Sequence, residues 1–156
     1  MAVRVLEYAP AFLLNNPRRP SLGILAVHQD WSALIGADNP AQPGEVIHAY
    51  ASGLGPTIPA VNYGQPAPSS EPFAHLRVNY TCVDDLNNPV SVLYEGLAPG
   101  LIGIYQIDLR LPTRPRSGDF GVHCSGLGSS FNGRILLNAK DLRRRPLPNR
   151  HLRAAS

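Results

Sequence analysis

Glycine and proline interrupt this sequence so often that only short regular elements fit between them. The chain holds 14 glycines and 16 prolines in 156 residues. Proline removes a backbone donor and glycine adds backbone entropy, so both break helices. The apolar runs between the breaks are short, which is typical of an all-β domain. They predict a β-sandwich of about seven short strands, at residues 23–28, 45–51, 76–83, 90–94, 103–111, 120–124 and 133–138.

The clearest predicted strand covers residues 103–111. There Ile107 and Leu109 alternate with Gln106 and Asp108. Because successive side chains of a strand point to opposite faces, this alternation places the two sets on opposite sides of the sheet. We therefore expect a half-buried strand with one face in water.

The charged residues are few and unevenly placed. Only 16% of residues are charged, which excludes a coiled coil, a helical bundle and a basic nucleic-acid-binding domain. Residues 140–156 hold six basic residues and one acid, whereas residues 1–139 hold eight arginines and ten acids. We therefore expect an N-terminal lead-in over 1–20, a sandwich over 21–139 and a disordered, Arg-rich tail over 140–156. Three consecutive arginines without aromatics between them support nucleic-acid binding only weakly.

The apolar runs also bear on location. None approaches the ~18–20 residues of a membrane span. The first residues lack the apolar core of a signal peptide. The chain is therefore expected to be cytosolic, or to be a piece of a longer secreted protein.

Two cysteines, Cys82 and Cys124, lie in predicted strands. The alternation around each places its sulfur on the apolar, inward face. Two inward cysteines on separate strands favour an inter-sheet disulfide, which closes a loop of about 43 residues and adds roughly 4 kcal/mol on the chain-entropy model. Such a bond indicates an extracytoplasmic protein. The alternative is two buried free thiols that pack as small hydrophobic groups.

Sequence patterns for catalysis and cofactor binding are missing. The glycine strings at 53–56 and 126–130 fit neither a phosphate loop nor a dinucleotide-binding turn. The five histidines lack the spacing of a zinc site, and an inward Cys124 without basic neighbours is a poor nucleophile. We therefore expect no enzyme activity, no cofactor and no metal. A hydrolase remains the alternative only if a cleft gathers His28, His123 and an aspartate.

Two features leave a binding role open. Trp31 and Tyr63 are the aromatic residues in predicted loops that are best placed to stack on a ligand such as a sugar. Their alternative use is to anchor loops or the core. The densest group of oxygen ligands suits Ca²⁺, although its spacing favours a turn in which Asx side chains bond their own backbone; it consists of Asp84, Asp85, Asn87 and Asn88.

Two longer strings resemble a known family. The first is NPAQPGEV at 39–46 followed by YASGLGP at 50–56, and the second is VLYEGLAPGLIGIYQI at 92–107. Both resemble the signatures of an uncharacterised domain that is abundant in Solibacter and other Acidobacteria, usually at the C-terminus of large secreted proteins. With smaller similarities the resemblance spans about residues 9–124. After Cys124 the sequence departs from the family pattern, which leaves the last strand less well defined.

The resemblance implies an immunoglobulin-like β-sandwich that serves as an accessory module, and it brings no catalytic residues. The glycines and prolines of both strings have a structural explanation, because they permit positive φ, close backbone approach and strand ends; these residues are Gly53, Gly55, Pro56, Gly96, Pro99 and Gly100. We therefore predict a non-catalytic, secreted or cell-surface module of adhesion type, within a longer precursor, whose partner is a protein or a glycan. The alternative function is a carbohydrate-binding module that uses Trp31 and Tyr63.

Overall fold

The computed structural model describes residues 8–114 and 118–138, and all of its regular elements except one 3-10 turn are strands. The all-β prediction is therefore confirmed. The short 3-10 turn is η1 (Pro20–Leu22). The strands are β1 (Ala11–Phe12), β2 (Ala26–Val27), β3 (Val46–Ser52), β4 (Thr57–Ile58), β5 (His75–Leu76), β6 (Thr81–Asp84), β7 (Pro89–Leu97), β8 (Tyr105–Arg110), β9 (Asp119–Gly126) and β10 (Ser129–Leu136).

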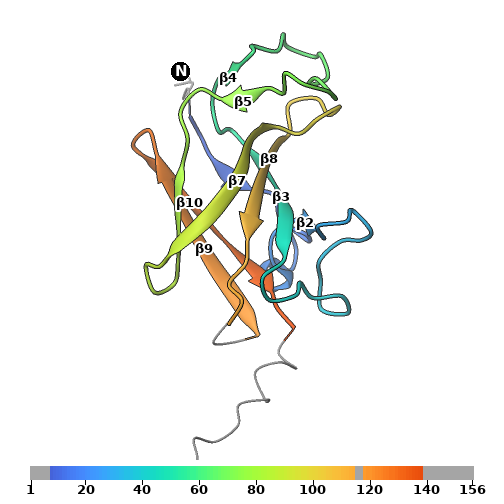
Figure 1. Ribbon diagram of the computed structural model, residues 1–156, viewed down its shortest axis with the longest axis vertical. Coiled ribbons are helices and arrows are strands. Elements are labelled where there is room, and N and C mark those ends of the chain that lie inside the picture. The colour runs from blue at the N-terminus through green and yellow to red at the C-terminus, as the bar shows by residue number, and fades with distance from the viewer. Residues whose placement is uncertain (1–7, 115–117, 139–156) are drawn as a thin grey trace, which may run out of the picture.

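These strands form one antiparallel sheet that curls into a barrel-like sandwich (Figure 1). Its main path runs β1-β3-β8-β7-β6-β9-β10, while β2 pairs with β3, and β5 pairs with both β4 and β7. The last strand meets the N-terminal part of the chain: the amide of Ile24 donates to the carbonyl of Arg134 at 2.9 Å, and the amide of Ala41 donates to that of Leu136 at 2.9 Å. The segment predicted as a lead-in thus contributes β1 to the sheet. The predicted basic tail lies outside the described residues.

The core lies between the two curved halves of the sheet. Its centre consists of aliphatic side chains from β3, β8 and β9 that have no exposed surface, namely Ile47, Ile107, Leu109 and Val122. Each such side chain stabilises the fold by about 1.5–3 kcal/mol relative to exposure. Tyr80 and Phe131 extend the core in an edge-to-face pair, with ring centroids 5.3 Å apart.

Cys82 and Cys124 form a disulfide, as predicted. They are directly opposite each other on the neighbouring strands β6 and β9, with Cα atoms 4.1 Å apart. The expectation of an inter-sheet bond was therefore wrong: the disulfide joins adjacent, paired strands. Both residues are buried, in agreement with the inward alternation read from the sequence.

The run 76–83, predicted as one strand, is divided between β5 and β6. The division arises because β5 pairs with the far end of β7 at Gly96, whereas β6 pairs with the beginning of β7 and with β9. At the break, the amide of Tyr80 donates to Oε2 of Glu95 at 3.0 Å. Glu95 is only 6% exposed, and its Oε1 has no hydrogen-bond partner among the described residues. Burial raises the pKa of this carboxyl to about 7.

The outer face of β8 is more buried than the alternation of its side chains predicts. Gln106 is 5% exposed, and its side-chain amide donates to Oδ1 of Asp108 at 2.8 Å. The last strand, β10, is longer than predicted and follows β9 through a two-residue turn. Leu127 and Gly128 in this turn both have positive φ, 55° and 72°, as a type I′ hairpin requires.

Candidate functional site

The candidate site is built on the loop that follows β2. The amide of Trp31 donates to the carbonyl of His28 at 2.9 Å, and Oδ1 of Asp30 accepts the amide of Ser32 at 3.0 Å. Hydrogen bonds from Ser32 hold the pKa of Asp30 below its usual value, so its charge persists at neutral pH. Trp31 has φ of 62°, a left-handed conformation that is rare for bulky residues and that clusters at functional sites.

This turn places the Trp31 indole flat against the imidazole of His48. The ring centroids are 3.6 Å apart and the planes differ by 9°. His48 is buried in the middle of β3, whereas Trp31 is 54% exposed. One side of the indole therefore rests on the protein while a large part of its surface faces solvent.

The imidazole beneath Trp31 is fixed from both sides. Nδ1 of His48 lies 2.8 Å from Oδ1 of Asp108, the residue opposite it on β8. Nε2 lies 3.2 Å from the backbone oxygen of Gln29. Because Gln106 also donates to Asp108, the plane of the imidazole and hence the plane of the indole are well defined.

A polar hollow of about 480 Å³ lies beside the turn that carries Trp31; Asp30 and Ser32 line it, whereas Trp31 and His48 do not. Its walls carry amide, hydroxyl and carboxylate groups, including those of Gln29, Asp30, Ser32, Asn39 and Gln42. Asp30 and Glu45 give the hollow a negative balance, and no lysine or arginine is among its described lining residues.

Glu45 holds the wall of the hollow together. Its Oε1 lies 2.8 Å from Nδ1 of His28 and accepts the amide of Gln29 at 3.0 Å. Its Oε2 accepts the amide of Gln42 at 2.7 Å. Nε2 of His28 faces the backbone oxygen of Asn39 at 3.3 Å. The Glu45 carboxylate thus joins residues 28–29 to Gln42, and His28 adds a contact to Asn39, which preorganises the hollow.

The two aromatic residues selected from the sequence do not form one platform. Tyr63 is fully exposed in the loop between β4 and β5, which lies at the upper end of Figure 1, whereas Trp31 lies over β3. Within the described residues no ring contact joins them, and neither Trp31 nor Tyr63 lines either of the two described cavities. Trp31 differs from Tyr63 in that its ring is stacked on another side chain, that of His48.

The histidines of the hydrolase alternative are also separated. His28 pairs with Glu45 beside the polar hollow. Nε2 of His123 lies 2.9 Å from Oδ1 of Asp85 at a half-exposed site on β9. No cleft in the described part of the chain gathers His28, His123 and an aspartate.

Asp84 and Asp85, which belong to the predicted oxygen cluster, have separate uses. Oδ1 of Asp84 accepts the amides of Leu86 and Asn88, both at 2.8 Å, which forms an Asx turn. Asp85 instead forms a hydrogen bond with the imidazole of His123. Among the residues described, no group of three or more His, Cys, Asp or Glu side chains is arranged to hold a metal ion.

The first resemblance string forms a sealed corner after β3. Gly53 and Gly55 have φ of 66° and 109°, and a Cβ there would collide with the backbone of Ala9 and the ring of Tyr8. Leu54 is 1% exposed, so it plugs this end of the sandwich. Pro56 follows the corner immediately before β4.

The second string forms the connection between β7 and β8. A Cβ at Gly96 would lie 2.3 Å from the carbonyl oxygen of Ala74, so this glycine permits close strand approach. Pro99 and Gly100 form the turn, and Gly100 has φ of 77°. Space beside Gly103 is open, so its positive φ of 66° explains this glycine.

Sequence reasoning missed His48, Gln106 and Asp108 as parts of the site. The available signal was a histidine inside the apolar run 45–51, together with two polar residues on one face of 103–111. Their meeting depends on the pairing of β3 with β8, which no local pattern specifies.

Comparisons with known proteins add no relative: no protein-family model, no curated protein and no solved structure matches this chain. Among the described residues, no helix is long and apolar enough to cross a membrane.

Proposed function

We propose that this protein is a non-catalytic extracellular accessory module of adhesion type, and that its target is a neutral glycan held at Trp31. The extracellular part of the proposal is supported by the buried Cys82–Cys124 disulfide, because such bonds persist in oxidising compartments. The accessory role is supported by the resemblance to the Solibacter domain family. It is also supported by the structural use of both signature strings as corners of the barrel-like sandwich.

The observation that carries the glycan target is the rigid, half-exposed indole of Trp31 beside a polar hollow. Aromatic rings have an electron-rich face, and a pyranose ring offers polarised C–H groups to such a face. The amides and hydroxyl of the hollow supply the few directed hydrogen bonds that orient a ligand in a binding site. Because the lining is negative, it disfavours acidic sugars and favours neutral ones.

A glycan array followed by calorimetric titration tests the target. Trp31→Ala is expected to weaken binding of a neutral oligosaccharide about tenfold or more, which corresponds to about 1.4 kcal/mol. Tyr63→Ala is the matched control, because it removes another exposed aromatic residue that is outside the hollow, and it is expected to bind like the parent protein. A loss of binding in both variants, or no binding to any neutral glycan, would overturn the glycan target.

The extracellular assignment has its own test. The protein produced in the bacterial periplasm is expected to be folded with no free thiol, as measured by intact mass after alkylation of the unreduced protein. Production in a reducing cytosol is expected to give a less stable form that gains stability on oxidation. A cytosolic product with free thiols and equal stability would contradict an extracellular assignment.

A further inference from the structure

A second cavity, separate from the Trp31 hollow, opens at the lower end of the sandwich in Figure 1. It has a volume of about 560 Å³ and lies between the turn that joins β6 to β7 and the ends of β8 and β9 that face it. None of its described lining residues belongs to the Trp31 hollow. It therefore constitutes an independent candidate site.

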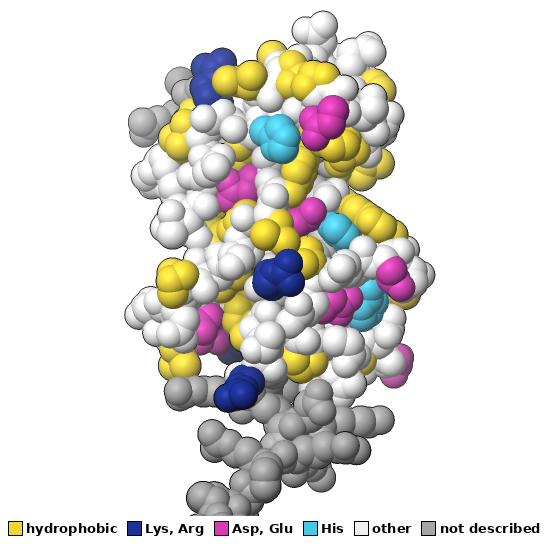
Figure 2. Space-filling model, in the orientation of Figure 1, with side chains coloured by type: hydrophobic (Ala, Val, Ile, Leu, Met, Phe, Trp, Pro, Cys, Tyr) yellow, Lys and Arg dark blue, Asp and Glu magenta, His cyan; other side chains and the backbone are white. Residues whose placement is uncertain are grey.

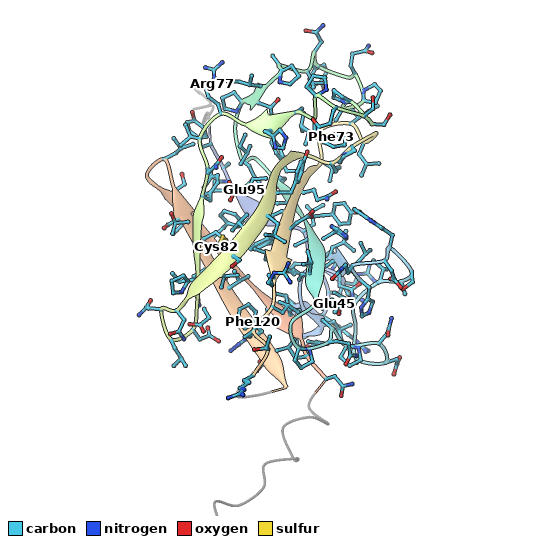
Figure 3. The ribbon with its side chains drawn as sticks, in the orientation of Figure 1. Glu45, Phe73, Arg77, Cys82, Glu95 and Phe120 are labelled. Carbon is cyan, nitrogen blue, oxygen red and sulfur yellow. A yellow bond between two sulfur atoms is a disulfide. The ribbon has the colours of Figure 1, made fainter. Side chains whose placement is uncertain are left out.

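The floor of this cavity is apolar. Leu111 and Phe120 belong to the core and are almost fully buried, so only a small part of each side chain faces the cavity. Val90 packs against the same core from β7. Leu86 is about half exposed on the rim. Figure 3 shows Phe120 near this lower end. Covering such a floor with an apolar ligand surface favours binding by about 25 cal/mol per Å² of apolar area removed from water.

The acidic side chains around the cavity are already engaged. Asp84 accepts the backbone donors of its own turn. Asp85 is paired with His123 and with Arg134, which together hold the pKa of Asp85 below its usual value. Asp119 lies 3.2 Å from the guanidinium of Arg134. These carboxylates are therefore poor candidates for binding a cationic ligand.

The two arginines that line the cavity have no such partners. Arg110 stands at the end of β8 and Arg114 four residues later, and in the described part of the chain neither guanidinium takes part in an ion pair. Asp108, the nearest acid along β8, is engaged by His48 and Gln106. Figure 2 shows basic side chains over the lower half of the visible face, with hydrophobic side chains exposed between them.

We propose that this cavity binds an organic anion with an apolar body, its carboxylate or sulfonate group paired with Arg110 and Arg114 and its body on Leu111 and Phe120. The argument is charge complementarity: two guanidinium groups that form no ion pair with the described residues lie beside an apolar floor, and they match a ligand that is anionic at one end and apolar at the other. The site is independent of the proposed glycan target, since the two hollows share no described lining residue.

The test uses 8-anilino-1-naphthalenesulfonate as the probe, with the full-length folded protein and fluorescence titration. The double variant Arg110→Gln/Arg114→Gln is expected to weaken probe binding about tenfold or more. Arg77→Gln is the matched control, because Arg77 is an exposed arginine near the opposite end (Figure 3), and it is expected to change binding less than about twofold. Thermal unfolding of each variant checks that the fold is intact.

A second probe separates the charge from the apolar body. N-phenyl-1-naphthylamine has the same aromatic body without the sulfonate, and it is expected to bind more weakly and to be insensitive to the arginine substitutions. Equal binding of the two probes would overturn the proposal. It would also be overturned by a double variant that binds the anionic probe as the parent does, or by no binding of that probe to the folded parent protein.

Discussion

The two ends of the sandwich use charge in opposite ways. We call the end that carries loops 53–74 and 98–104 the upper end, and the end that carries turn 85–88 and segments 111–114 and 118–121 the lower end. In the loops of the upper end, 53–74 and 98–104, Glu71 is the one charged residue. The lower end carries three aspartates, Asp84, Asp85 and Asp119, together with Arg134, Arg110 and Arg114; in the described part of the chain Arg110 and Arg114 form no ion pair.

The two ends also differ in how the chain closes them. At the upper end the long loops cross and bond to each other, with the amide of Ala67 donating to the carbonyl of Leu101 at 2.8 Å and that of Gly100 donating to Ala67 at 3.0 Å. Tyr80 donates its hydroxyl to the backbone oxygen of Leu54, and Tyr105 donates to that of Gly55. The lower end has instead a cavity lined by charged side chains together with Leu111 and Phe120.

The largest effect is expected from the disulfide, which ties together β6 and β9, the strands whose ends form the rim of the lower cavity. Replacing both cysteines, Cys82→Ala with Cys124→Ala, is expected to lower the free energy of unfolding by about 2–5 kcal/mol. Urea denaturation measures this loss. Hydrogen exchange should show faster opening of β6 and β9 than of β3 and β8. A loss under about 1 kcal/mol would mean that the lower end is held without the covalent link.

At the upper end, Leu54→Ala is expected to cost about 3 kcal/mol, because it leaves a cavity where a fully buried side chain closes the sandwich. Leu101→Ala is the control on the same end: Leu101 is largely exposed, so its loss is expected to cost less than about 0.5 kcal/mol. Equal effects in a denaturation experiment would show that burial of Leu54 does not close this end.

Glu95, in the middle of the sheet, is expected to make the free energy of unfolding depend on pH. Its carboxyl has a pKa of about 7 in the folded protein, raised by burial from 4.5. Below pH 4.5 both the folded and the unfolded forms are protonated. Between the two values only the unfolded form is ionised, so stability falls as pH rises, by an amount on the order of 3 kcal/mol, and then levels off above the folded pKa.

The variant Glu95→Gln keeps the shape of the neutral acid and is expected to remove this pH-dependent loss. The measurement is the difference in unfolding free energy between parent and variant from about pH 4 to pH 8, with the variant gaining stability toward the alkaline end. Glu71→Gln, a change at an exposed carboxyl, should leave the profile of the parent intact. A difference that stays constant with pH would show that Glu95 is ionised throughout this range.

The smallest effect is expected at the charged rim. Arg134→Gln removes two exposed ion pairs, to Asp85 at 3.5 Å and to Asp119 at 3.2 Å. Exposed pairs contribute about 0–1 kcal/mol each and are screened by salt. The stability loss should therefore be small at low salt and smaller still at high salt. A loss as large as that of Leu54→Ala would contradict the contrast between the two ends.

The sequence determined the features that depend on local alternation and on backbone conformation. The apolar runs predicted the all-β class and closely predicted the positions of four strands, β3, β7, β8 and β9, because the period of two and the Gly and Pro breaks act within a few residues. The same alternation around Cys82 and Cys124 put both sulfurs inside and so predicted the disulfide. The corner at Gly53–Gly55 followed from the backbone freedom of glycine.

Only the tertiary structure decided what depends on which strands become neighbours. The pairing of β3 with β8 brings His48 to Asp108, and the loop after β2 then lays Trp31 on that imidazole. The division of run 76–83 between two partners buries Glu95, and it places the disulfide between adjacent strands instead of between sheets. These contacts join residues far apart in the chain, and their register is set by packing of the whole sheet, which short-range sequence patterns do not encode.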